Sequence, residues 1–132
     1  MVPLGILLVA CTTTGPESRP AEVPTDSSKP VVVALANDAQ RAQEQGRYEQ
    51  AASYLERALR IDPTDALLWH RLAKVRFSQG RLQQAVHLAA KSNSVAGTNQ
   101  ALQRRNWRLL ADAWTALGRE DKAEAARRRA QE

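Results

Sequence analysis

The segment Gly46-Arg47-Tyr48-Glu49-Gln50-Ala51 has two further copies downstream in this chain of 132 residues. They are Gly80-Arg81-Leu82-Gln83-Gln84-Ala85 and Gly118-Arg119-Glu120-Asp121-Lys122-Ala123, which begin 34 and 38 residues after the copy before them. Self-similarity at a period of this length is the signature of a repeat protein, in which each repeat is one supersecondary unit. The chain is therefore expected to contain three related units.

Each copy is expected to join two helices. Its glycine fits the end of a helix, where a left-handed backbone conformation costs glycine little. The alanines at the ends of the copies, Ala51, Ala85 and Ala123, allow neighbouring helices to approach closely. Trp69 and Trp107 are expected to fill the space between neighbouring hairpins. The predicted helices span 31–45, 47–60, 65–79, 81–95, 99–117 and 119–131.

This pattern resembles the tetratricopeptide repeat, a helix–turn–helix unit of 34 residues. The resemblance rests on the glycine and alanine of each copy, on Trp69 with Leu72 and Ala73, and on Trp107 with Leu110. It implies an all-α fold of three repeats in a short right-handed superhelix. The repeats cover about 32–65, 66–103 and 104–132, and an insertion of four residues falls within 92–103. The charged last helix is expected to cap the stack.

The N-terminus carries an apolar run over 2–10, which is too short to span a bilayer and has the length typical of a signal peptide. The run ends in Leu8-Val9-Ala10-Cys11, which resembles the lipobox of bacterial lipoproteins. The resemblance implies a signal peptide over 1–10 and lipidation of Cys11. Thr12 stands where an Asp would signal retention in the inner membrane, so the same resemblance implies the periplasmic face of the outer membrane. The alternative is a buried apolar helix, against which the following polar stretch counts.

The segment 11–30 is rich in proline and polar residues and holds four of the six prolines in the chain. Such a composition has too little apolar surface to offset the entropy of ordering. We expect a disordered linker over 11–30 and a folded helical domain over 31–132.

The sequence shows no pattern of catalytic or metal-binding residues. The only two histidines, His70 and His87, lie on different predicted helices, and the single Cys excludes a Cys-based zinc site. We therefore expect no enzyme activity, no cofactor and no metal. The net charge of +5 raises the possibility of nucleic-acid binding, which the export signal argues against. The run Arg127-Arg128-Arg129 is interpreted as a solvated helix face, with attraction to an anionic partner or lipid headgroups as the alternative.

In tetratricopeptide proteins the first helix of each repeat lines a concave groove that binds partners. The resemblance implies that the groove here is lined by Gln40, Gln43, Glu44, Leu67, His70, Lys74, Phe77, Arg105, Arg108 and Asp112. Phe77 is either an anchor for a partner or a core residue. The carboxylate clamp of chaperone-binding members requires Asn where this chain has Gln40, Lys74 and Asp112, so we do not expect that clamp.

The order of anchor, linker and small repeat domain is similar to that of the outer-membrane lipoproteins that activate class A penicillin-binding proteins. This resemblance implies a non-catalytic, lipid-anchored periplasmic adaptor that binds a peptidoglycan synthase and activates it, with no role for nucleic acid. The alternative is an assembly factor, either a pilotin for a pilus secretin or an accessory to outer-membrane protein assembly. The oligomeric state stays open.

Replacing Cys11 tests the anchor. The Cys11→Ser chain has no thiol to carry a lipid, and it is expected to move from the membrane fraction to the soluble periplasmic fraction. Cell fractionation and immunoblotting measure this. Membrane association equal to that of the parent would refute the lipobox interpretation.

Overall fold

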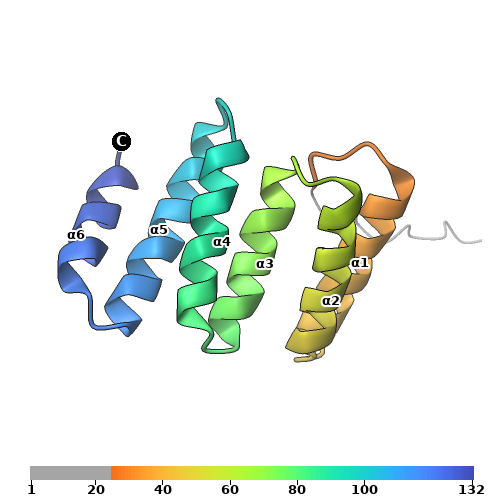
Figure 1. Ribbon diagram of the computed structural model, residues 1–132, viewed down its shortest axis with the longest axis horizontal. Coiled ribbons are helices and arrows are strands. Elements are labelled where there is room, and N and C mark those ends of the chain that lie inside the picture. Colours follow the sequence, from red (N-terminus) through yellow and green to blue (C-terminus); the bar gives the residue numbers. More distant parts are fainter. Residues whose placement is uncertain (1–24) are drawn as a thin grey trace, which may run out of the picture.

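The computed structural model describes residues 25–132, which form six helices and, within that range, no strand (Figure 1). The helices are α1 (Pro30–Glu44), α2 (Tyr48–Ile61), α3 (Ala66–Ser78), α4 (Leu82–Val95), α5 (Gln100–Ala116) and α6 (Glu120–Arg129). They pair into three hairpins, which confirms the expected all-α fold. The predicted helix boundaries agree with the observed ones to within two residues.

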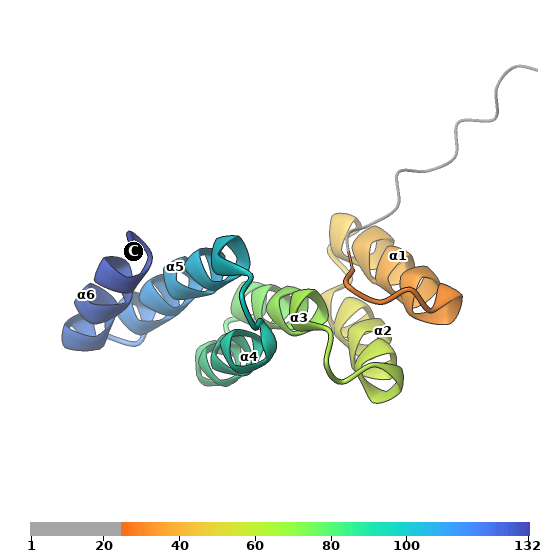
Figure 2. The ribbon, with the colours of Figure 1, turned by 90° about the horizontal axis from the view of Figure 1, so that it is seen from above.

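The hairpins stack side by side in chain order (Figure 1). Seen from above, α1, α3 and α5 form one layer of the stack, and α2, α4 and α6 form the other (Figure 2). Helix α3 is set back between α1 and α5, so the first layer is curved inward. We use the term inner face for the surface formed by α1, α3 and α5.

The same backbone turn closes all three hairpins. In the first, the amide of Gly46 donates to the carbonyl of Gln43 at 3.0 Å and the amide of Arg47 donates to that of Ala42 at 2.8 Å. This pair of bonds is the Schellman motif, which ends a helix on a left-handed residue. Gly46 has φ 71° and its equivalents have nearly the same value. A Cβ at these glycines would meet no neighbouring atom, so backbone conformation, and not space, requires glycine here.

The core consists of two clusters of apolar side chains that meet at α3. The first lies between hairpin 1 and α3 and includes Leu55, Leu68 and Val75. The second lies among α3, α4, α5 and α6 and includes Ala73 and Leu110. The repeat alanines, Ala51, Ala85 and Ala123, are fully buried, as the sequence indicates. Alanine lets the helix backbones approach closely, and this explains its recurrence at these points.

The folded part begins before the predicted boundary at residue 31. Ser27 is buried, and its amide donates to Oδ2 of Asp65 at 3.1 Å. The hydroxyl of Thr25 donates to the same oxygen, and Lys29 Nζ donates to the carbonyl of Ile61 at 3.2 Å. The end of the segment expected to be linker therefore packs on the loop between α2 and α3, because a buried carboxylate there supplies acceptors.

Asp65 has a second role at the start of α3. Its Oδ1 accepts from the amide of Leu68 at 3.0 Å, which is the usual bond of an N-terminal cap. The two oxygens of one buried carboxylate therefore fix the start of α3 and the start of the folded chain.

The first 24 residues lie outside the described part of the chain. The predicted signal peptide, Cys11 and most of the predicted linker fall there. Among the described residues, no helix is long and apolar enough to cross a membrane.

Trp69 tests the packing between hairpins 1 and 2. Its ring packs against the first core cluster, and its indole N–H donates to the carbonyl of Pro63 at 2.8 Å. Trp69→Ala is expected to lower the free energy of unfolding by about 3 kcal/mol, since a large and partly buried ring is lost. Trp69→Phe keeps a ring but loses the hydrogen bond, and should cost about 1 kcal/mol. Urea denaturation measures both. An unchanged midpoint for Trp69→Ala would show that the ring does not stabilise the fold.

Candidate partner-binding face

The inner face brings most of the predicted groove residues to the surface. Five of them are exposed, namely Glu44, Lys74, Arg105, Arg108 and Asp112. Four are partly buried, namely Gln40, Gln43, Leu67 and Phe77. His70 is buried, with 7% of its surface exposed. The structure therefore removes His70 from the set of residues that a partner could touch directly.

His70 belongs to a polar network that joins α3 to α4 and α5. Its Nδ1 lies 2.7 Å from Oδ1 of Asn106, which is fully buried. The amide of Asn106 donates to Ser92 Oγ at 2.7 Å and to Asn93 Oδ1 at 2.9 Å, and Ser92 donates to the carbonyl of Ala66. Because the amide nitrogen of Asn106 is the donor in two bonds, its oxygen accepts, and His70 Nδ1 carries the hydrogen.

Burial is the main cause that lowers the pKa of His70. The hydrogen bond with Asn106 opposes this effect, and the positive charges of Arg105, Lys74 and Arg71 lower the pKa further. His70 is therefore neutral at pH 7. Two of these cations, Lys74 and Arg105, are exposed.

Arg71, the residue after His70, joins α3 to α1. Its Nη2 donates to the carbonyl of Ala36 at 3.2 Å and to Gln40 Oε1 at 3.1 Å. Burial lowers the pKa of Arg71 to about 10, and the charge of Asp65 opposes that shift. The guanidinium therefore keeps its charge at neutral pH. Its Nη1 is buried and has no hydrogen-bond partner among the described residues.

Some cations of the described residues form ion pairs and others do not. Arg76 turns toward α2, where it bonds Glu49 and Glu56, and Arg127 pairs with Glu120. Within residues 25–132, Lys74 and Arg105 have no ion pair. The inner face therefore presents charge that the fold itself leaves uncompensated.

The other predicted groove residues lie in different places. Phe77 packs against the second core cluster, which favours the core interpretation. Gln40 donates to Glu44 at 2.7 Å and accepts the hydrogen bond from Arg71. Arg108 and Asp112 line a hollow of about 360 Å³ between α5 and α6. Gln43 lies near the end of α1 and Leu67 in the first turn of α3.

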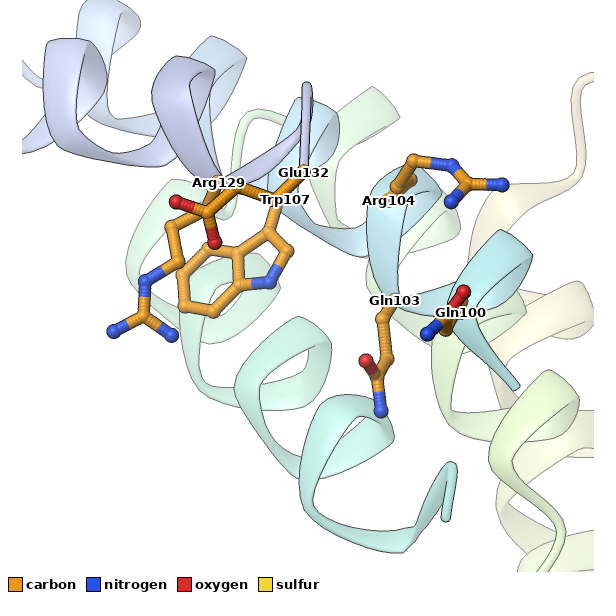
Figure 3. Close-up of a pocket in the computed structure, with 6 residues that line it drawn as sticks. All are labelled: Gln100, Gln103, Arg104, Trp107, Arg129 and Glu132. Carbon is orange, nitrogen blue, oxygen red and sulfur yellow. The ribbon is translucent and has the colours of Figure 1, made fainter. Parts of the chain in front are cut away.

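A further hollow of about 190 Å³ lies where the start of α5 meets the end of α6 (Figure 3). It is lined by Gln100, Gln103, Arg104, Trp107, Arg129 and Glu132. The guanidinium of Arg129 lies 5.1 Å from the centre of the Trp107 ring, within the range of a cation–π interaction. This hollow contains none of the groove residues predicted from the sequence.

The described part of the chain holds no group of three or more His, Cys, Asp or Glu that could bind a metal. What the inner face offers is hydrogen-bond donors and positive charge on a rigid helical surface. Such an arrangement suits recognition of another macromolecule.

Sequence reasoning missed Arg71, Asn106 and Ser92. A signal for Asn106 was present, because it shares a helical stripe with Leu102, Leu110 and Ala113, all of which are buried. A polar residue on an apolar stripe indicates a buried hydrogen bond. Arg71 gave no such signal, since a charged residue beside a groove position resembles any surface residue.

Comparisons with known proteins agree with this architecture. A sequence model of the tetratricopeptide repeat matches residues 42–104. The globular C-terminal domain of P. aeruginosa LpoP has 37% identity and a TM-score of 0.77, covering 80% of this chain and 100% of that domain. The N-terminal domain of stress-induced protein-1 from C. elegans has a TM-score of 0.73 over 78% of this chain and 86% of that domain. With 17% identity, it shares the fold alone. No curated protein matches the chain in sequence.

The neutral state of His70 predicts a pH dependence. Its pKa is lower in the folded chain than the ordinary 6.5, so the unfolded chain binds the proton more readily. The free energy of unfolding should therefore fall as the pH drops below about 6.5. His70→Gln removes the titrating group and should weaken this fall between pH 7.5 and 5, as measured by urea denaturation, while His87→Gln keeps it. Equal slopes for the parent and His70→Gln would contradict the burial of His70.

Proposed function

Because the chain belongs to the tetratricopeptide repeat family that includes the globular domain of LpoP, we propose that it binds and activates a peptidoglycan synthase. The synthase would be a class A penicillin-binding protein. The observation that carries the proposal is the 37% identity over the whole of the LpoP domain. It agrees with the resemblance of the chain's layout to lipoprotein activators of such synthases.

The adaptor would act by binding alone. The described residues offer a polar inner face, and activation requires only that this face prefer one conformation of the synthase over another. A ligand shifts a conformational equilibrium by as much as its affinities for the two states differ. A rigid stack suits this task, since its surface does not have to be ordered when the partner binds.

The proposed location is the periplasmic face of the outer membrane. Here the signal peptide over 1–10 would direct export, and the lipid on Cys11 would anchor the chain. The folded part begins by residue 25, so about 13 residues would remain as a tether. At full polyproline extension they would span on the order of 40 Å. The synthase would then have to reach most of the way from the opposite membrane.

An activity assay tests the proposal. The full lipidated chain in detergent is added to the purified class A penicillin-binding protein of the same organism, and glycan polymerisation is followed with labelled lipid-linked precursor. The rate is expected to rise several-fold, while the chain without synthase gives no turnover. An unchanged rate at saturating chain would contradict activation, and turnover by the chain alone would contradict an adaptor role.

A further inference from the structure

We propose that the inner face binds an acidic segment of its protein partner through a basic cluster formed by Arg71, Lys74 and Arg105. The inference rests on the proposed function for the identity of the partner, and on the structure for the chemistry that the partner must present.

The charge is segregated by helix. Helix α3 carries the cations Arg71, Lys74 and Arg76 and has no Asp or Glu. Helix α5 carries three arginines and one acid, Asp112. Arg76 lies on the side of α3 that faces α2 and pairs with acids there. The inner face therefore keeps the other cations of α3 and receives Arg105 from α5.

The three cations of the basic cluster are placed around the bond between His70 and Asn106, because Arg71 follows His70 and Arg105 precedes Asn106 in the chain. Their charges lower the pKa of His70. Lys74 follows Arg71 by three residues on α3, a spacing that places side chains on one face of a helix. Arg105 reaches the same region from α5, where Asn106, the next residue, bonds His70.

The inner face carries two exposed acids, Glu44, which bonds Gln40, and Asp112, which lines the hollow between α5 and α6. Other acids form ion pairs away from the basic cluster. Glu49 and Glu56 bond Arg76 on α2, Glu120 and Glu124 bond Arg127 on α6, and Asp38 bonds Arg41. Asp65 offsets part of the charge of Arg71 from the start of α3. Like charges held close together repel, and a carboxylate from outside would relieve that repulsion.

Arg71 is suited to form the floor of such a site. Two hydrogen bonds fix its guanidinium between α3 and α1, so little side-chain entropy is lost on binding. Its partly buried position weakens screening by water, which strengthens attraction to an anion. Lys74 and Arg105 are exposed beside it and can contact carboxylates directly.

The shape of the inner face favours a protein segment over a membrane surface. Helix α3, which carries Arg71 and Lys74, is set back between α1 and α5 (Figure 2). A flat bilayer would meet α1 and α5 before α3. An extended acidic segment can contact α3 and α5 together.

The test reverses charge at the two exposed members and leaves Arg71, which stabilises the fold, in place. The variant is Lys74→Glu/Arg105→Glu. The matched control is Arg57→Glu/Arg60→Glu, which reverses two exposed cations of α2 that have no ion pair among the described residues. Each full-length chain in detergent is titrated with the purified synthase, with a labelled hexaglutamate peptide and with phosphatidylglycerol vesicles. Circular dichroism confirms that both variants fold.

The Lys74→Glu/Arg105→Glu chain, called the groove variant, is expected to bind the synthase and the peptide at least tenfold more weakly than the parent. The control is expected to stay within about twofold, and parental binding should weaken as salt is raised. Equal binding of the synthase by parent and groove variant would overturn the inference and leave the proposed function standing. If the parent chain binds no synthase, the proposed function fails, and binding of the hexaglutamate peptide then tests the basic cluster. Equal peptide binding by the parent and the Lys74→Glu/Arg105→Glu variant would overturn the inference, and so would a variant that loses only vesicle binding.

Discussion

Two successive residues of α3 hold the outer hairpins to the middle one on the inner side of the stack. His70 reaches α5 through Asn106, and Arg71 reaches α1 through Ala36 and Gln40. The apolar clusters meet at the same helix, since α3 contributes side chains to both. The curvature of the inner layer therefore depends on α3. A substitution that loosened either polar contact would alter the position of a neighbouring hairpin and with it the shape of the inner face.

The same contacts create the electrostatic character of that face. Arg71 keeps its charge although it is partly buried, and Lys74 and Arg105 are exposed in the same layer, so these cations accompany the neutral imidazole of His70. The fold tolerates this because His70 remains neutral and Asn106 satisfies it. Arg76 of the same helix is compensated instead, because it pairs with Glu49 and Glu56 of α2.

Much of the fold could be predicted from the sequence because its rules are local. Gly46 and its equivalents end helices through a backbone conformation, and Ala51 and its equivalents permit close packing, so a short pattern located all three hairpins. The burial of His70 could not be predicted in this way. A position in the repeat says which way a side chain leaves its helix but not what lies opposite, and Asn106 is 36 residues away beyond an insertion. The packing of Ser27 on Asp65 could not be predicted for the same reason. A polar, proline-rich stretch has the composition of a linker, and the sequence does not show that Asp65, 38 residues away, accepts a hydrogen bond from it.

The central claim, that the inner face is the surface by which this adaptor binds a peptidoglycan synthase, can be tested in cells by site-specific photocrosslinking. A photoreactive amino acid is placed at Ser78, which is exposed one turn beyond Lys74 on α3, or at Ser53, which is exposed on α2. Crosslinked species are purified from membranes and identified by mass spectrometry. The account predicts an adduct with a class A penicillin-binding protein from position 78 and none from position 53. Adducts from position 78 that contain a secretin or outer-membrane assembly proteins instead, or a synthase adduct from position 53 alone, would contradict it.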